Sequence, residues 1–192
     1  MSHRSVVAFA VAFTLAVAAC SAPPVTSFDP AGPCVADGSS PGAYPELEAL
    51  VPKIYQGVAP ATLDSGRTCP GPNLGSLASA GVDEIRFGGG TWTFGAERAA
   101  VLAVFQGTGL TAGALADFYA NSARDASRTT ILSESSPTIV GRPGRRLDTQ
   151  TGERLQTVVV WASNTVGRVN VVITNDLPDA RIQDALDAFG SN

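Results

Sequence analysis

Two apolar runs near the C-terminus place the strongest constraint on the fold. Residues 154–162 read RLQTVVVWA and residues 168–174 read RVNVVIT, and only the short link Ser163–Gly167 separates them. Both runs are rich in β-branched residues, and the second alternates Val and Ile with other side chains, which is typical of a strand. A link this short suits neighbouring antiparallel strands. The two runs therefore predict a β-hairpin.

Helical and extended patterns surround this hairpin. Residues 111–124 predict an internal helix that Thr111 can cap, and the residues after Pro178 predict an amphipathic C-terminal helix. Residues 57–73 predict a loop, and the run Gly88–Gly90 predicts a β-bulge or a hairpin turn. The other predicted elements are helices over 46–54 and 74–80 and strands over 84–87, 91–94, 99–106, 129–132 and 138–140. This order predicts an α+β domain, with an antiparallel sheet of about 4–6 strands and helices packed on one face.

Composition narrows the function classes. The chain has 192 residues, which suits one domain. Hydrophobic residues make up 44% and charged residues 16%, which excludes a disordered acidic tail. The formal net charge of −4 and the sequence pI of about 4.9 argue against a nucleic-acid partner.

The first twenty residues have the layout of an export signal. Arg4 gives a short polar start its positive charge, and residues 6–16 (VVAFAVAFTLA) form an uncharged run of eleven residues. That run is too short to cross a hydrocarbon core of about 30 Å as a helix. The tetrapeptide Val17-Ala18-Ala19-Cys20 follows it. The order of charge, apolar run and small residues is typical of a signal peptide.

Residues 1–20 resemble the signal peptide and lipobox of bacterial lipoproteins. The resemblance implies that a diacylglycerol is attached to the Cys20 sulfur and that the chain is cut between Ala19 and Cys20. It also implies a protein held on the outer side of the cell membrane by its acyl chains, which are palmitate-like in such proteins. The alternative is an ordinary secretory peptide that leaves Cys20 for a disulfide. The layout of the folded part resembles small envelope lipoprotein domains, but no motif in it transfers a function.

The remaining cysteines and the tether depend on that assignment. If Cys20 carries lipid, Cys34 and Cys69 remain as a pair in an oxidising compartment, where we expect a disulfide rather than two free thiols. Residues 21–43 are rich in Ser, Ala, Pro and Gly and lack a hydrophobic period, which is typical of a linker. We therefore expect a signal peptide over 1–19, a lipid-anchored tether over 20–43 and a single α+β domain over 44–192.

Few residues are suited to catalysis. His3 is the only histidine, and cleavage after Ala19 would remove it, which leaves no imidazole for Ser-His-Asp catalysis or for a zinc site. We expect no metal and no cofactor. Asp148 and Glu153 flank a predicted turn and form the best candidate carboxylate pair for a hydrolase.

One basic cluster could bind an anion. Arg142, Arg145 and Arg146 lie together in GRPGRR, and three guanidinium groups could hold a lipid headgroup or a phosphorylated polymer. The alternative is a solvated hairpin turn whose charge Asp148 and Glu153 balance.

Three functions follow from these observations. The first is a non-catalytic, membrane-anchored domain that binds a small ligand or an envelope protein, for which an exposed apolar patch on the sheet would be the expected sign. The second is a hydrolase that uses Asp148 and Glu153, which requires the two carboxylates to converge. The third is a structural or assembly protein without a small ligand.

Overall fold

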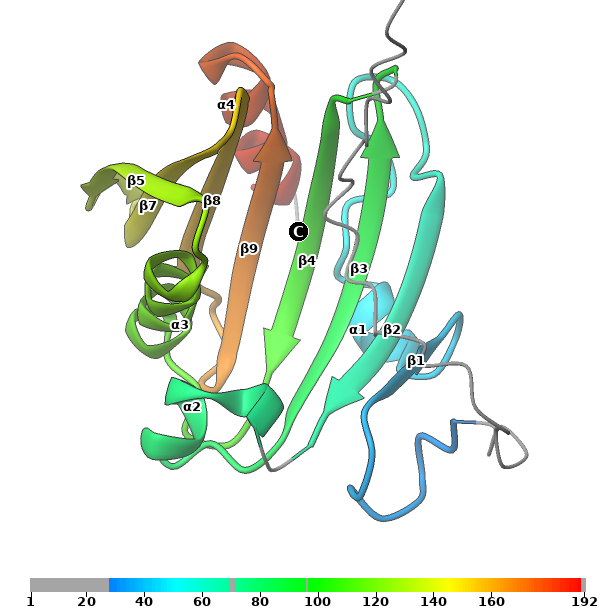
Figure 1. Ribbon diagram of the computed structural model, residues 1–192. Coiled ribbons are helices and arrows are strands. Elements are labelled where there is room, and N and C mark those ends of the chain that lie inside the picture. The colour runs from blue at the N-terminus through cyan, green and yellow to red at the C-terminus, as the bar shows by residue number, and fades with distance from the viewer. Residues whose placement is uncertain (1–27, 70–71, 96, 191–192) are drawn as a thin grey trace, which may run out of the picture.

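The computed structural model describes residues 28–69, 72–95 and 97–190, and nine strands among them form one antiparallel sheet (Figure 1). The strand order is β1-β2-β3-β4-β9-β8-β7-β5, and β6 adds a short pairing to β7. The strands are β1 (Gly38–Ser40), β2 (Thr62–Thr68), β3 (Ile85–Thr93), β4 (Ala99–Gln106), β5 (Thr129–Ser135), β6 (Thr138–Ile139), β7 (Arg142–Thr151), β8 (Arg154–Ala162) and β9 (Arg168–Asn175). The antiparallel sheet is confirmed, but it has more strands than the 4–6 expected.

Four α-helices pack on this sheet within the described residues. They are α1 (Pro45–Glu48), α2 (Ser76–Ser79), α3 (Ala112–Asp125) and α4 (Asp179–Phe189), and a 3₁₀ turn, η1 (Pro72–Leu74), precedes α2. In α3 the Thr111 hydroxyl accepts a hydrogen bond from the Ala114 amide, so the predicted cap is confirmed. The helix predicted over 46–54 forms only as α1, because Pro52 supplies no amide hydrogen to continue it.

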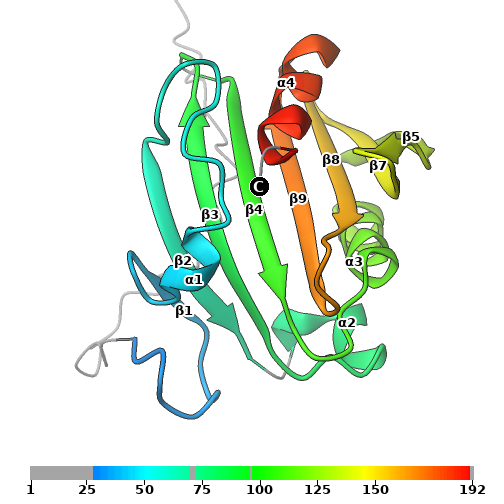
Figure 2. The same cartoon turned by 180° about the vertical axis from the view of Figure 1, so that it is seen from behind.

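The helices cover both faces of the sheet, which corrects the expectation of one covered face. Val159 and Trp161 of β8 belong to a core with α1 and α4, whereas Val158 and Val160 belong to a second core with α2 and α3. Successive side chains of a strand point to opposite faces, so the apolar run of β8 supplies both cores. Figures 1 and 2 show α3 on one face and α1 and α4 on the other.

The glycine run lies inside a strand, not in a turn. Gly88, Gly89 and Gly90 continue β3 without interruption and pair with both β2 and β4. A Cβ on Gly88 would lie 2.7 Å from the backbone carbon of Leu47 in α1. The missing side chain therefore allows the backbone of α1 to approach the sheet closely.

Two polar segments predicted as a loop and a turn are strands. Residues 62–68 (TLDSGRT) form β2, and GRPGRR enters β7. Neither segment has the alternating apolar pattern of a half-buried strand. Both nevertheless join the sheet, because their backbones form hydrogen bonds with neighbouring strands.

Part of the predicted tether also belongs to the domain. Residues 38–40 form β1 and pair with β2, and Phe28 packs against the core and lies edge-on to Tyr44. The described residues of the tether therefore fold with the domain, which includes the chain from Phe28 and not only from the expected residue 44. The pairing partner lies about 25 residues downstream, which a local pattern does not reveal.

Candidate functional site

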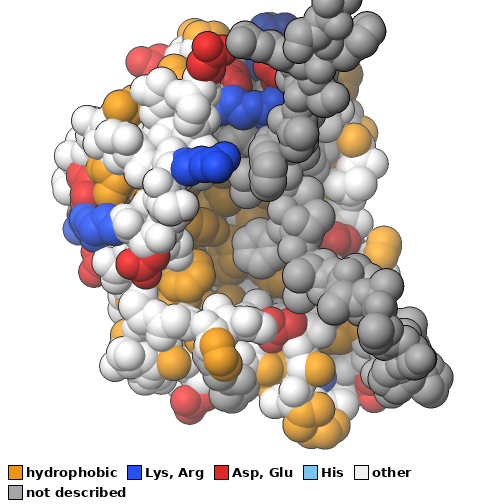
Figure 3. Space-filling model, viewed as in Figure 1, with side chains coloured by type: hydrophobic (Ala, Val, Ile, Leu, Met, Phe, Trp, Pro, Cys, Tyr) orange, Lys and Arg blue, Asp and Glu red, His pale blue; other side chains and the backbone are white. Residues whose placement is uncertain are grey.

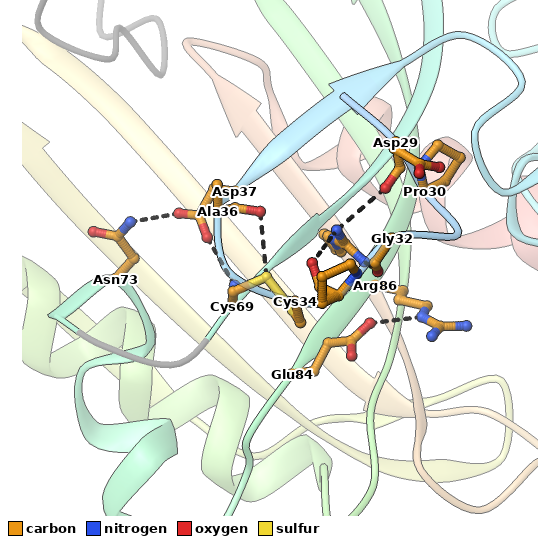
Figure 4. Close-up of a disulfide and its surroundings, with 12 residues drawn as sticks. Asp29, Pro30, Gly32, Cys34, Ala36, Asp37, Cys69, Asn73, Glu84 and Arg86 are labelled. Atoms are coloured by element: carbon orange, nitrogen blue, oxygen red, sulfur yellow. Dashed lines mark hydrogen bonds and ion pairs between the residues drawn. A yellow bond between two sulfur atoms is a disulfide. The ribbon is translucent and has the colours of Figure 1, made fainter. Parts of the chain in front are cut away.

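The disulfide fastens the N-terminal loop to the sheet, as predicted. Cys34 and Cys69 are bonded, with Cα atoms 5.4 Å apart, and the neighbouring Asp37 carboxylate accepts hydrogen bonds from the Cys69 amide and the Asn73 side chain (Figure 4). The loop is held again by Arg67. Its guanidinium donates to the backbone carbonyls of Asp29, Gly32 and Pro33.

The predicted arginine cluster does not form a single site. Arg145 and Arg146 are neighbours on β7 and point to opposite faces of the sheet. Arg145 approaches Asp117 of α3 and Glu134 at 3.8 and 3.9 Å, whereas Arg146 bonds Asp179 of α4 at 2.7 Å. Arg142 donates instead to the Ser163 carbonyl, 2.9 Å away. The alternation of the strand separates three charges that lie together in the sequence.

The candidate carboxylate pair does not converge either. Asp148 lies within β7, where its carboxylate accepts hydrogen bonds from Ser133, Arg146 and Thr157 at 2.6 to 3.0 Å. Glu153 lies in the exposed turn between β7 and β8, about five residues along the chain, and no hydrogen bond joins the two. Burial raises the pKa of Asp148, but the hydrogen bonds from Thr157 and Ser133 and the Arg146 charge outweigh it and lower the pKa overall. Such a carboxylate is poorly suited to act as a general acid.

Two tyrosines have pKa values raised by burial. The Tyr55 hydroxyl donates to the Arg181 carbonyl at 2.8 Å, and burial raises its pKa against the opposing effect of the Arg181 charge. Burial alone raises the pKa of Tyr119, between α3 and the sheet. Both hydroxyls therefore stay protonated near neutral pH, which is unfavourable for a base.

On the α3 side of the sheet, an apolar strip is left without cover by the helices that the structure describes. We use this name for Phe87, Val101, Ala103, Phe105 and Ile173, which the strand register places on one face of β3, β4 and β9. Ala103 is buried and the other four are partly exposed. Phe87 and Phe105 lie in contact, with ring centroids 6.0 Å apart.

No described helix covers the strip. α3 packs on β5, β7 and β8, and α2 packs on α3, whereas α1 packs on β2, β3 and β4 from the opposite face. Figure 3 shows apolar side chains in a hollow near the middle of the face that carries α3. The described side chains that β3, β4 and β9 present on this face include no charged residue.

The sequence pattern predicts a strand over 99–106 and does not reveal the strip. AAVLAVFQ is apolar on both faces, which is typical of a strand covered on both sides. Phe105 lies on the face of the sheet, opposite Phe87 of β3. Only the packing shows where α3 lies, so the sequence pattern could not reveal that no described helix covers the strip.

Other kinds of site find no support in the described ranges 28–69, 72–95 and 97–190. No group of three or more His, Cys, Asp or Glu side chains there could hold a metal ion. None of the helices in those ranges is long and apolar enough to cross a membrane. The expected lipidation and cleavage residues, Ala19 and Cys20, lie outside the described residues.

Comparison with known proteins adds no assignment. No protein-family model matches the chain, and no curated protein matches it.

Proposed function

We propose that the protein is a lipid-anchored domain of the bacterial envelope that binds an apolar ligand or partner through the apolar strip, and that it is not an enzyme. The observation that carries the proposal is a partly exposed, uncharged strip on three adjacent strands. On this face α3 packs on β5, β7 and β8, and an exposed apolar patch on a folded domain is a common sign of a binding surface.

The described fold adds a constraint on the proposed anchor. Because Phe28 already packs against the domain, only Ser21–Ser27 would separate it from a lipid on Cys20. Seven extended residues span about 23 Å at ~3.3 Å each. The domain would then stand near the membrane surface, where apolar molecules are concentrated.

The anchor is tested by fractionation. Cys20→Ser should move the protein from the membrane to the soluble fraction, because two or three acyl chains hold a domain firmly and none remain in the variant. Mass spectrometry of the native protein should show an N-terminal Cys20 that carries acyl chains. An unprocessed N-terminus, or a Cys20→Ser protein that stays with the membrane in alkaline carbonate, would contradict the anchor.

The binding surface is tested with Nile red, an uncharged apolar dye. The wild-type protein should enhance the fluorescence of the dye, and Val101→Asp should abolish the enhancement because it places a charge on the strip. Val166→Asp is the matched control, since Val166 is 100% exposed in the loop between β8 and β9. Circular dichroism establishes that both variants fold. A folded Val101→Asp protein that binds the dye like the control would rule out the strip as the binding surface.

A further inference from the structure

We propose that the apolar strip binds an amphipathic helix of a partner protein, and that this helix carries a basic residue that pairs with Asp64 of β2. This inference rests on the proposed function, because it names the class of partner that the same surface takes. It adds Asp64 to the site and specifies the shape and the charge of what binds there.

The face beside α3 has room for one helix. α3 contacts β5, β7 and β8, and it is therefore centred near β7, the middle strand of the three (Figure 1). β9 and β4 are the second and third strands from β7, or about 10 and 14 Å away at ~4.8 Å per strand. Packed helices lie about 8–10 Å apart and are about 10–12 Å wide, so a single helix fits beside α3 over β9 and β4.

The length of the strip sets the length of the apolar face that binds it. Val101 to Phe105 covers four residue intervals of β4, or about 14 Å at ~3.4 Å each, which about nine residues of a helix cover. Beyond one end, Ile85 is buried in the core formed with α2 and α3. Beyond the other end lie the polar side chains of Thr93 and Asn175, which both pair with Ala99. A short amphipathic helix therefore matches the strip.

Small side chains at the centre of the strip allow a helix to approach closely. Gly89 pairs with Ala103 there, and the nearest described atom to a Cβ on Gly89 would be the Ala103 Cβ at 3.5 Å. On the opposite face, the adjacent Gly88 already allows the backbone of α1 to lie close to the sheet. The same strand thus offers a flat position to a helix on each of its faces.

Asp64 borders the strip at the level of its centre. It pairs with Gly89, so its side chain lies on the same face as Ala103, two strands away. The side chain is partly buried, and its carboxylate has no hydrogen-bond or ion-pair partner among the residues that the structure describes. None of the side chains that β2 and β3 present on this face is basic.

The carboxylate of Asp64 selects the charge of the partner. A helix that covered the strip would remove water from this carboxylate, which is costly unless the partner supplies a donor. A lysine or arginine beside the apolar face of the helix supplies both the donor and the opposite charge, whereas an acidic residue there would repel Asp64. The same repulsion disfavours an anionic lipid.

The experiment measures the binding of two fluorescein-labelled peptides by fluorescence anisotropy. Each has about 14 residues, is stapled as a helix, and carries leucine along one face and glutamine elsewhere. Beside the middle of the leucine face, one peptide has lysine and the other has glutamate. The wild-type protein should bind the lysine peptide about five-fold more tightly, because only lysine pairs with Asp64.

Two substitutions separate a local charge from the net charge. Asp64→Lys should reverse the preference, so that the glutamate peptide binds more tightly. Glu46→Lys is the matched control, because it changes the net charge equally at an exposed position of α1, on the opposite face. It should keep the preference of the wild type. Circular dichroism establishes that both variants fold.

The outcomes separate this inference from the proposed function. If Asp64→Lys keeps the preference of the wild type while Val101→Asp loses Nile red, the partner assignment is wrong and the binding function stands. Binding of Nile red without binding of either peptide would overturn the helix in the same way. If Val101→Asp binds the dye normally, the proposed function fails as well.

Three results would show that another occupant covers the strip. A stable dimer that neither peptide disturbs would show that the occupant is a second copy of the chain. Peptide binding that begins only after proteolysis ahead of Phe28 would show that it is the N-terminal segment of the chain itself. Preference for phosphatidylglycerol vesicles over both peptides would show that it is a lipid surface.

Discussion

Replacing Gly88 with alanine gives a sharp test of how α1 meets the sheet. The added Cβ would lie 2.7 Å from the Leu47 carbon, 2.8 Å from the Glu48 nitrogen and 3.0 Å from the Leu47 oxygen. All three are backbone atoms, so α1 itself must move, and it carries Leu47, which is 1% exposed in the core. Overpacking of this kind costs about 3 kcal/mol. We therefore expect Gly88→Ala to lower the free energy of unfolding by about that amount.

The neighbouring glycine provides a matched control. At Gly89 the nearest described atom to an added Cβ is the Ala103 Cβ at 3.5 Å, an ordinary contact on the opposite face. Gly89→Ala should therefore be neutral or stabilise the fold by about 0.5 kcal/mol, because alanine restricts the unfolded chain more than glycine does.

Thermal unfolding, followed by circular dichroism and repeated in urea, compares the two variants. For a chain of this size, about 3 kcal/mol corresponds to a decrease in Tm of roughly 6–12 °C for Gly88→Ala. Equal Tm values for Gly88→Ala and Gly89→Ala would refute the close approach of α1 to β3. A larger loss for Gly89→Ala would show that the two faces of β3 have been exchanged.

Three further predictions concern the disulfide-bonded loop, the partly buried Asp148 carboxylate and Arg67. Replacing Cys34 and Cys69 with alanine opens a link across 35 positions and should cost about 4 kcal/mol in urea unfolding, an amount that reduction of the wild type should reproduce. Folding lowers the pKa of Asp148, so this carboxylate stabilises the folded state fully above its ordinary pKa of about 3.9. The stabilisation is lost as the pH falls through the lower pKa of the folded state. Asp148→Asn should therefore reduce the decrease in unfolding free energy below about pH 4, whereas Glu153→Gln should not. Arg67→Met removes the donors to three loop carbonyls and should speed amide hydrogen exchange at Ala31 and Gly32 while leaving exchange in β8 unchanged. A uniform change in both segments would contradict a local role.

Several elements could be predicted from local pattern. The hairpin of β8 and β9, strand β4, and helices α3 and α4 each follow from the spacing of their own apolar residues, with Thr111 as the cap of α3. The pairing of Cys34 with Cys69 follows from the cysteine count once Cys20 is assigned to lipid. In these cases the information lies within the element or in a count.

The candidate sites could not be predicted in the same way. Arg145 and Arg146 are adjacent in sequence and separated by the sheet, whereas Asp64 and Ala103 are distant in sequence and lie on one face of the sheet, two strands apart. Strand alternation and register decide both outcomes, and neither is visible until the neighbouring strands are known.

The amino-acid sequence by itself determined that apolar strands pair as hairpins between amphipathic helices, because side-chain periodicity acts over a few residues. Only the tertiary structure decided that the polar segments 38–40, 62–68 and 142–151 join the sheet. Their backbones form hydrogen bonds with neighbouring strands, and the local sequence does not show which strands are neighbours. It also decided which face each helix covers. No described helix covers the apolar strip, because α3 packs on β5, β7 and β8 and not on β3 and β4.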